Sequence, residues 1–138
     1  MTRVSCTTTI DASAETVWRT ISDFGGAARY LYLVAQCMVE GKGVGALRTL
    51  TSEDGSVIVE RLEALNDDAH RLSYLLLTET PFRDCLTTME VHDLDPGHCE
   101  VEWSATFEAA GIPPDEARTM LEAALVENCL ALKHFLEQ

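Results

Sequence analysis

The sequence predicts an α+β fold in which a curved antiparallel sheet packs against one long C-terminal helix. Two observations lead to this class. The middle of the chain consists of strand-like runs of about seven residues, separated by turn-forming Gly, Asp, Asn and Pro. The last segment changes to a helical period, with apolar residues three and four positions apart. Strands grouped together and followed by a helix are typical of α+β proteins, whereas alternating strands and helices would indicate a parallel sheet.

The N-terminal part is expected to hold one strand and two short helices. Residues 4–10 are rich in Thr and β-branched side chains that alternate with period two, which predicts a strand. Cap residues around Ser13 and apolar residues at helical spacing predict a short helix at about 14–23. Gly25 and Gly26 interrupt it, and a second short helix is expected at 27–33.

The middle of the chain is expected to form a meander of six further strands. Each is bounded by turn signals, of which Asp54-Gly55 is a strong hairpin signal and Asp95-Pro96-Gly97 marks the last turn. The expected strands are 35–40, 46–51, 57–65, 71–78, 83–91 and 98–109. Counting the first strand, the sheet has seven.

The final segment is expected to be a helix that crosses the whole sheet. Pro113 and Pro114 followed by two acidic residues suit a helix start. About 22 residues would span about 33 Å. The expected apolar face comprises Ala117, Met120, Leu121, Ala124, Leu125, Leu132, Phe135 and Leu136. Because one helix about 10 Å wide cannot fill the concave side of a curled sheet, a cavity is expected beneath it.

Composition and charge restrict the partners. The 138 residues suit a single domain, expected to span 1–138, and their formal net charge of −13 disfavours nucleic acid and stable association with acidic membranes. The five cysteines form no CxxC or zinc-like cluster and are expected to be reduced, buried side chains. No apolar run has signal-peptide or membrane-span length, so a cytoplasmic location is expected. Monomer and dimer both stay open.

Five short segments, in order along the chain, resemble the polyketide cyclase/dehydrase branch of the START-like (SRPBCC) superfamily. They are Ile10-Asp-Ala-Ser-Ala-Glu-Thr-Val-Trp18 leading to Asp23-Phe24, Gly45-Ala-Leu-Arg48, Val59-Glu-Arg-Leu62, Arg71-Leu-Ser-Tyr74, and Val101-Glu-Trp103 leading to Phe107. The resemblance spans essentially the whole chain. It implies the helix-grip fold, as in birch-pollen-allergen-like proteins, with a hydrophobic pocket between the sheet and the final helix. It implies no shared catalytic motif, so it says more about the fold than about the chemistry.

Arg48 and Glu60 flank the predicted Asp54-Gly55 hairpin and are the leading site candidates. In the resembled hormone receptors, the position matching Glu60 faces the cavity. A charged residue among apolar neighbours is costly to bury unless it is paired, so we expect an Arg48–Glu60 ion pair at the pocket wall. The alternative is that the strand register turns one or both side chains into solvent.

Other candidates combine apolar walls with a few polar groups. Tyr74 is expected to reach the interior, either to anchor a ligand oxygen or as a core residue. Asn128 lies on the apolar face of the final helix, where the resemblance implies a polar anchor for ligand and the alternative is a bond to sheet backbone. Trp103 and Phe107 suit core packing or a cavity wall. The expected ligand-binding set is Arg48, Ile58, Glu60, Leu62, Tyr74, Met89, Trp103, Phe107, Met120, Ala124 and Asn128.

Three functions are compatible with these residues. The first is binding of a small hydrophobic molecule, such as a lipid, polyketide or isoprenoid, as a carrier or sensor. The second is a cyclase or dehydratase that uses Glu60 as the acid/base group. The third is a protein-interaction module with a filled core. The four histidines are expected at the surface, and no spacing in the sequence indicates a metal or cofactor.

Overall fold

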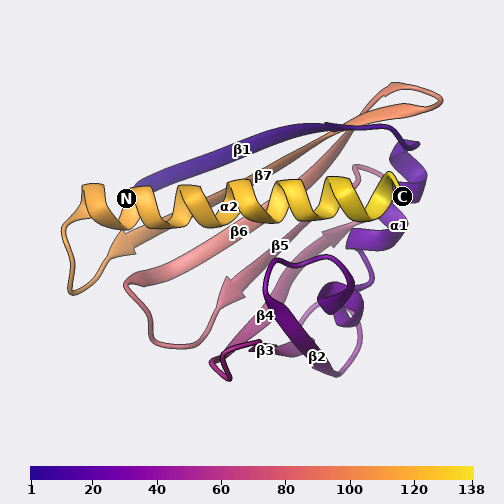
Figure 1. Ribbon diagram of the computed structural model, residues 1–138. Helices are drawn as coiled ribbons and strands as arrows, with labels where there is room; N and C mark the ends of the chain where they lie inside the picture. The colour runs from indigo at the N-terminus through magenta and orange to yellow at the C-terminus, as the bar shows by residue number, and fades with distance from the viewer.

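The computed structural model describes residues 1–138 and has a single seven-stranded antiparallel sheet with a long helix lying along its concave side (Figure 1). The elements, in chain order, are β1 (Thr2–Ile10), α1 (Ala14–Ile21), the 3-10 helix η1 (Phe24–Arg29), β2 (Val34–Glu40), β3 (Leu47–Ser52), β4 (Val57–Asn66), β5 (Arg71–Leu76), β6 (Phe82–Asp95), β7 (His98–Ala109) and α2 (Pro114–Leu136). The predicted fold class and the order of its elements are therefore confirmed.

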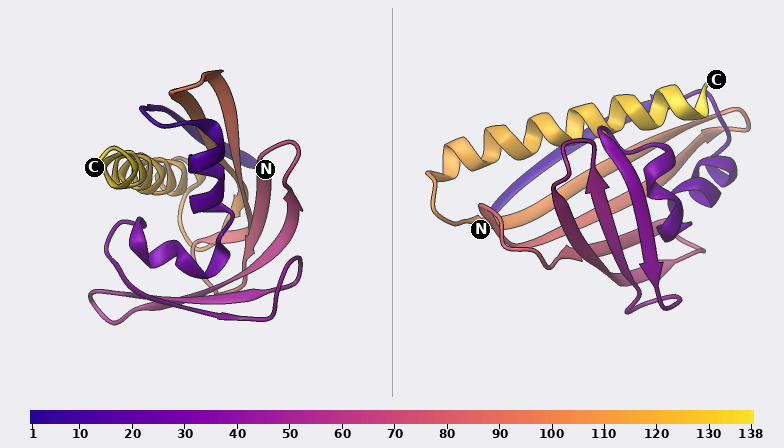
Figure 2. Two further views of the ribbon diagram at one scale, coloured as in Figure 1. Left: turned by 90° about the vertical axis from the view of Figure 1, so that its right-hand side faces the viewer. Right: turned by 60° about the horizontal axis from the view of Figure 1, so that its bottom comes forward.

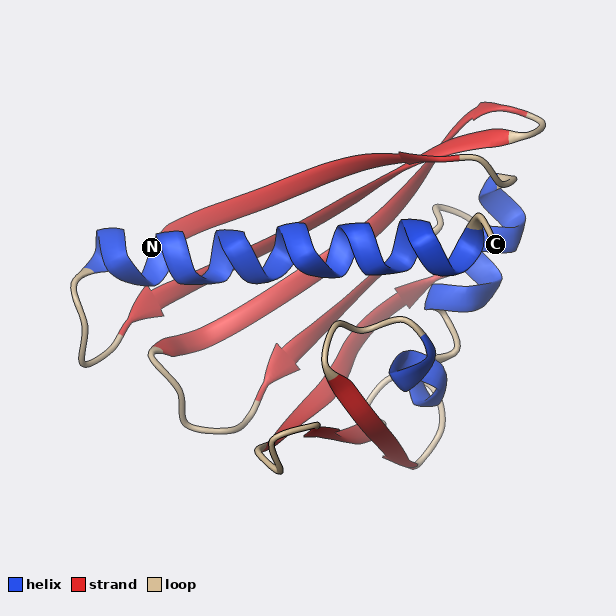
Figure 3. Cartoon of the chain, in the orientation of Figure 1, coloured by secondary structure: helices blue, strands red, loops and turns tan.

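The sheet has the strand order β1-β7-β6-β5-β4-β3-β2. Strands β2 to β6 each pair with the next strand in sequence, whereas β1 forms the edge opposite β2 by pairing with β7, from Thr2↔Phe107 to Ile10↔Cys99. The sheet curls around α2, and the two short helices cover one end of the bowl (Figures 2 and 3). These helices close the concave side of the sheet at that end, so strands β2 to β5 form the wall opposite α2.

The local structure at the N-terminal end follows the predicted pattern, except that the second short helix is shifted. The helix α1 begins at a cap in which the Ser13 hydroxyl accepts the Thr16 N–H at 3.1 Å, as Ser at an N-cap usually does. The second short helix lies at Phe24–Arg29 and not at 27–33, so it includes Gly25 and Gly26, which were expected to separate the two helices. Gly25 is required there because a Cβ atom would lie 2.8 Å from the Val39 side chain on β2.

The helix α2 packs along β1 and β7, and no helix of the structure is long and apolar enough to cross a membrane. Its buried side chains are Ala117, Leu125, Cys129 and Leu132. Met120, predicted to belong to this buried face, is 47% exposed, and Ala124 is also exposed. The prediction was wrong for both because α2 is turned toward β1 and β7, which leaves these two side chains on its open flank.

The interior beneath α2 is largely filled by side chains of the central strands. Trp103, Phe107, Met89 and Leu72 are each at most 1% exposed. They form one apolar core with the buried face of α2 and with α1. The space left for a cavity is therefore displaced from the middle of the sheet toward β3, β4 and β5.

This packing makes Leu132 a position where truncation is costly. We expect Leu132→Ala to lower the free energy of unfolding by about 2–5 kcal/mol, because its side chain is fully buried and its removal leaves a cavity. Leu130→Ala on the same helix is the matched control, since Leu130 is 56% exposed and should change stability by less than about 0.5 kcal/mol. Urea unfolding measures both; equal losses would contradict the observed orientation of α2.

Candidate functional site

A buried ion pair joins the neighbouring strands β3 and β4. Arg48 and Glu60 are register partners, and their side chains both point to the concave side. The Arg48 Nε donates to Glu60 Oε1 at 2.8 Å, and Arg48 Nη2 lies 2.8 Å from the same oxygen. The side chains are only 3% and 11% exposed, so the predicted Arg48–Glu60 pair is confirmed.

Aromatic rings enclose the Arg48 guanidinium on two sides. Its carbon lies 4.1 Å from the centre of the Phe24 ring and 4.5 Å from that of the Tyr74 ring, as in cation–π contacts. Its Nη1 donates to the Phe24 carbonyl oxygen at 3.3 Å. Burial by itself lowers the pKa of Arg48, but the Glu60 carboxylate and the phenols of Tyr74 and Tyr30 together outweigh burial and raise the pKa above its usual value. The guanidinium therefore stays charged and fixed in place.

Two buried tyrosines complete the polar cluster. The Tyr74 hydroxyl oxygen accepts the Trp103 Nε1–H at 3.2 Å, which leaves its own proton free to donate. Burial raises the pKa of Tyr74 well above its usual value, and burial also raises the pKa of Tyr30. Both phenols are therefore neutral hydrogen-bonding groups at physiological pH, next to one balanced ion pair.

A cavity of about 200 Å³ lies in front of this cluster. Most of its lining residues are hydrophobic, and Glu60, Tyr74 and Asn128 bring the strongest hydrogen-bonding side chains to it. Its lining residues are Leu31, Tyr32, Val34, Leu50, Ser52, Ile58, Glu60, Tyr74 and Asn128. Arg48 lies behind Glu60 and does not line the cavity. An apolar hollow with a few convergent polar groups is typical of a small-molecule site.

Asn128 ties the loop between η1 and β2 to the helix α2. Its Oδ1 accepts the backbone N–H of Tyr32 at 3.0 Å. Neither prediction for Asn128 anticipated this partner, since the amide bonds to loop backbone and not to the sheet. The loop also holds Leu33 at φ +59°, a region that side chains other than Gly rarely adopt. The loop therefore forms one rim of the cavity and α2 the other.

Four of the predicted ligand-binding residues line this cavity: Ile58, Glu60, Tyr74 and Asn128. The other predicted ligand-binding residues lie elsewhere. Leu62 lines a second hollow, between η1 and the loop that joins β2 to β3. Met89, Trp103 and Phe107 are fully buried core side chains that line none of the described hollows. Met120 and Ala124 are exposed on α2, for the reason given above. Sequence reasoning missed Leu31 and Tyr32 in the loop and Val34 at the start of β2, whose only signal was their apolar character.

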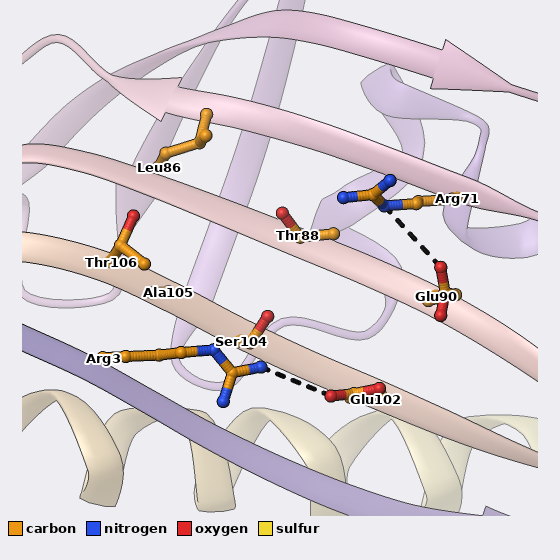
Figure 4. Close-up of a pocket in the computed structure, with 9 residues that line it drawn as sticks. All are labelled: Arg3, Arg71, Leu86, Thr88, Glu90, Glu102, Ser104, Ala105 and Thr106. Atoms are coloured by element: carbon orange, nitrogen blue, oxygen red, sulfur yellow. Dashed lines mark hydrogen bonds and ion pairs between the residues drawn. The ribbon is translucent and has the colours of Figure 1, made fainter.

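Two further hollows lie apart from the ion pair. One, of about 290 Å³, is on the convex face of the sheet and is lined mostly by polar side chains (Figure 4). The other, of about 510 Å³, lies beside the loop between β5 and β6. Neither is lined by Arg48, Glu60 or Tyr74. The concave cavity is the one that combines apolar walls with buried polar groups, and we therefore take it as the candidate site.

The chemistry available in the cavity is hydrogen bonding and proton transfer. Glu60 can accept a proton or a hydrogen bond, and Tyr74 can donate one. Thiolate chemistry is disfavoured at the nearby Cys85, because burial raises the pKa of its thiol to about 11. All five cysteines are free.

Comparisons with known proteins agree with this architecture. The family model described as "Polyketide cyclase / dehydrase and lipid transport" matches residues 1–136. An uncharacterised protein from Bacillus thuringiensis is 26% identical, with a TM-score of 0.92, covering 99% of this chain and 100% of that one. A START superfamily protein from Mycobacterium smegmatis is 18% identical, with a TM-score of 0.85 and coverage of 99% and 97%. The ZhuI aromatase/cyclase from Streptomyces sp. R1128 is 23% identical, with a TM-score of 0.77 and coverage of 98% and 90%. The family model confirms the predicted resemblance to the polyketide cyclase/dehydrase family, and the START superfamily neighbour shares the fold.

The buried pair predicts an asymmetric response to mutation. We expect Arg48→Met to lower the free energy of unfolding by about 3–5 kcal/mol, because it leaves the Glu60 carboxylate buried without its partner. The control is Arg61→Met, which removes a solvated pair with Glu63 on the same sheet and should cost less than about 1 kcal/mol. Denaturant unfolding measures both, and an Arg48→Met variant as stable as Arg61→Met would refute the buried pair.

Proposed function

Because the chain belongs to the polyketide cyclase/dehydrase and lipid transport family, we propose that it binds a small, largely apolar molecule in the cavity beside the Arg48–Glu60 pair. The observation that carries this proposal is the contrast within the cavity. Its walls are apolar, yet a carboxylate and a phenol reach it, each held in place by a buried partner. Such pre-positioned polar groups orient a ligand at little entropic cost.

The geometry of Glu60 supports a particular kind of ligand group. Both contacts from Arg48 go to Oε1, which leaves Oε2 available to accept a hydrogen bond. Tyr74 can donate to a ligand oxygen from the neighbouring strand. A hydroxyl or enol on the ligand would use both groups, since it can donate to Glu60 and accept from Tyr74.

The size of the cavity supports a compact ligand. The cavity is partly open to solvent, and its volume of about 200 Å³ is below the roughly 300–1,000 Å³ usual for drug-sized ligands, so it would fit roughly one or two fused rings. A longer ligand would have to displace the loop between η1 and β2, which is held to α2 by the Tyr32–Asn128 hydrogen bond. A carrier or sensor role requires only that this loop move away to admit the ligand and return afterwards.

Ligand binding is tested by thermal melting against hydroxylated one- and two-ring aromatics, fatty acids, sterols and isoprenoids. We expect a hydroxylated small-ring compound to raise the melting temperature, since a ligand present at 100 times its Kd stabilises the native state by about 2.7 kcal/mol. The same compound should have a smaller effect on Glu60→Leu than on Glu63→Leu, whose carboxylate lies outside the cavity. Failure of every class would favour a protein-interaction module instead.

A second candidate function is catalysis of cyclisation or dehydration. The observation that favours it is the Glu60 carboxylate at the cavity wall beside the neutral Tyr74 phenol: the carboxylate could accept a proton, and the phenol could donate a hydrogen bond. The family description and the similarity to an aromatase/cyclase add support. In this function Glu60 would take a proton from the substrate, and Tyr74 would hydrogen-bond the carbonyl oxygen.

The variant Glu60→Gln separates the two functions once a ligand or substrate is known. A binder should lose affinity by no more than about tenfold, because the amide still forms hydrogen bonds. An acid/base enzyme should lose about 10²–10⁴-fold in kcat while still binding substrate. Single-turnover kinetics and calorimetry measure the two effects, with Glu63→Gln as the control. Unchanged turnover in Glu60→Gln would rule out Glu60 as the acid/base group.

A further inference from the structure

Three side chains on the convex face of the sheet bring potential metal-binding atoms together. Glu90 and His92 are two residues apart on β6, so they project from the same face, and Glu102 lies directly across from Glu90 on β7. The intervening residues Val91 and Val101 point into the core, which places these three side chains on the side away from α2. The cluster adjoins the convex hollow, in which Glu90 and Glu102 lie on neighbouring strands (Figure 4).

The three side chains converge on one point. The His92 Nε2 lies 3.0 Å from Glu90 Oε1 and 3.5 Å from Glu102 Oε1, and the three ligand atoms are all within 4.8 Å of one another. Tetrahedral zinc with bonds of about 2.0–2.1 Å separates its ligand atoms by about 3.3–3.5 Å. The two distances from His92 Nε2 lie near this spacing, so small adjustments of the side chains would let the three atoms share one ion, with the open side left for water.

Hydrogen bonding alone leaves the cluster incompletely satisfied. Two carboxylates directly opposite each other on neighbouring strands repel. The His92 Nε2 carries at most one proton, so it can donate fully to only one of the two facing oxygens. Glu100, the register partner of His92, adds another negative charge to the same face. A cation placed between the Oε1 atoms and Nε2 would relieve this repulsion.

The flanking arginines hold the carboxylates without occupying the converging atoms. Arg71 Nε lies 3.6 Å from Glu90 Oε2, and Arg3 Nη2 lies 3.4 Å from Glu102 Oε2. Each carboxylate therefore directs its other oxygen, Oε1, toward His92. Groups that hold the outer oxygen of a ligand in this way are typical partners around metal sites, where they fix ligand orientation.

We propose that Glu90, His92 and Glu102 form a surface site for Zn²⁺ or a similar divalent transition-metal ion. The imidazole ligand favours these ions over Mg²⁺ and Ca²⁺, which prefer oxygen ligands alone. The bound ion would link β6 to β7 on the face opposite the cavity. The site is independent of the proposed ligand binding, so either proposal can fail without the other.

The test uses calorimetry on the full chain after chelator treatment, with ZnCl₂ and MgCl₂ as probes under reducing conditions. We expect one Zn²⁺ per chain and no measurable Mg²⁺ binding. His92→Ala and Glu102→Gln should each weaken Zn²⁺ binding by at least about tenfold, and circular dichroism should show that both variants remain folded. A rise in melting temperature with Zn²⁺ that is lost in His92→Ala gives a second readout.

His98→Ala is the matched control. His98 also contacts two carboxylates, but it contacts Asp95 through Nδ1 and Asp11 through Nε2, so those oxygens do not converge on one ring nitrogen. We expect this variant to bind Zn²⁺ as the unmodified chain does. Absence of Zn²⁺ binding, or binding that persists unchanged in His92→Ala, would overturn the proposal; in the second case the ion would be held elsewhere, for example by the free cysteines.

Discussion

The buried Arg48–Glu60 pair is the interaction on which the candidate site depends. The Arg48 guanidinium and the Glu60 carboxylate are both buried away from water. Each charge must therefore be compensated by its partner and by the surrounding dipoles and aromatic rings. The register of β3 and β4 provides the first partner, and Phe24 and Tyr74 enclose the guanidinium. A slip of either strand by one residue would turn its charged side chain to the convex face, away from its partner, and would carry the apolar side chains of that strand out of the core.

The cavity follows from where this pair lies relative to α2. The long helix packs along β1 and β7, and the large side chains of β6 and β7 fill the space beneath it. On the opposite side, the pair, the two phenols and the loop between η1 and β2 occupy the bowl without filling it. The result is a small cavity next to fixed polar side chains, Glu60 and Tyr74. These side chains suit either ligand binding or proton transfer.

Much of this arrangement could be predicted from the sequence, because it depends on local patterns. Period-two alternation and turn residues located the strands. The pairing of Arg48 with Glu60 was expected from the Asp54-Gly55 hairpin and the cost of burying a lone charge, together with the resemblance to receptors in which the position matching Glu60 faces the cavity. The orientation of α2 could not be predicted, because its apolar residues cover a wide arc of the helix surface. Met120 and Ala124 therefore fitted the pattern as well as the buried Leu132 did. The partner of Asn128 lies in an irregular loop, which no periodicity describes.

The most direct test of the buried pair and its cavity is the NMR signal of the Arg48 Nε–H group. A hydrogen-bonded, buried guanidinium exchanges its proton with water slowly, whereas exposed arginines exchange fast. We predict one persistent Arg side-chain Nε–H resonance near neutral pH that disappears in Arg48→Met and shifts when a ligand enters the cavity. If no such resonance is seen, or if it persists in Arg48→Met, the account of the site is wrong.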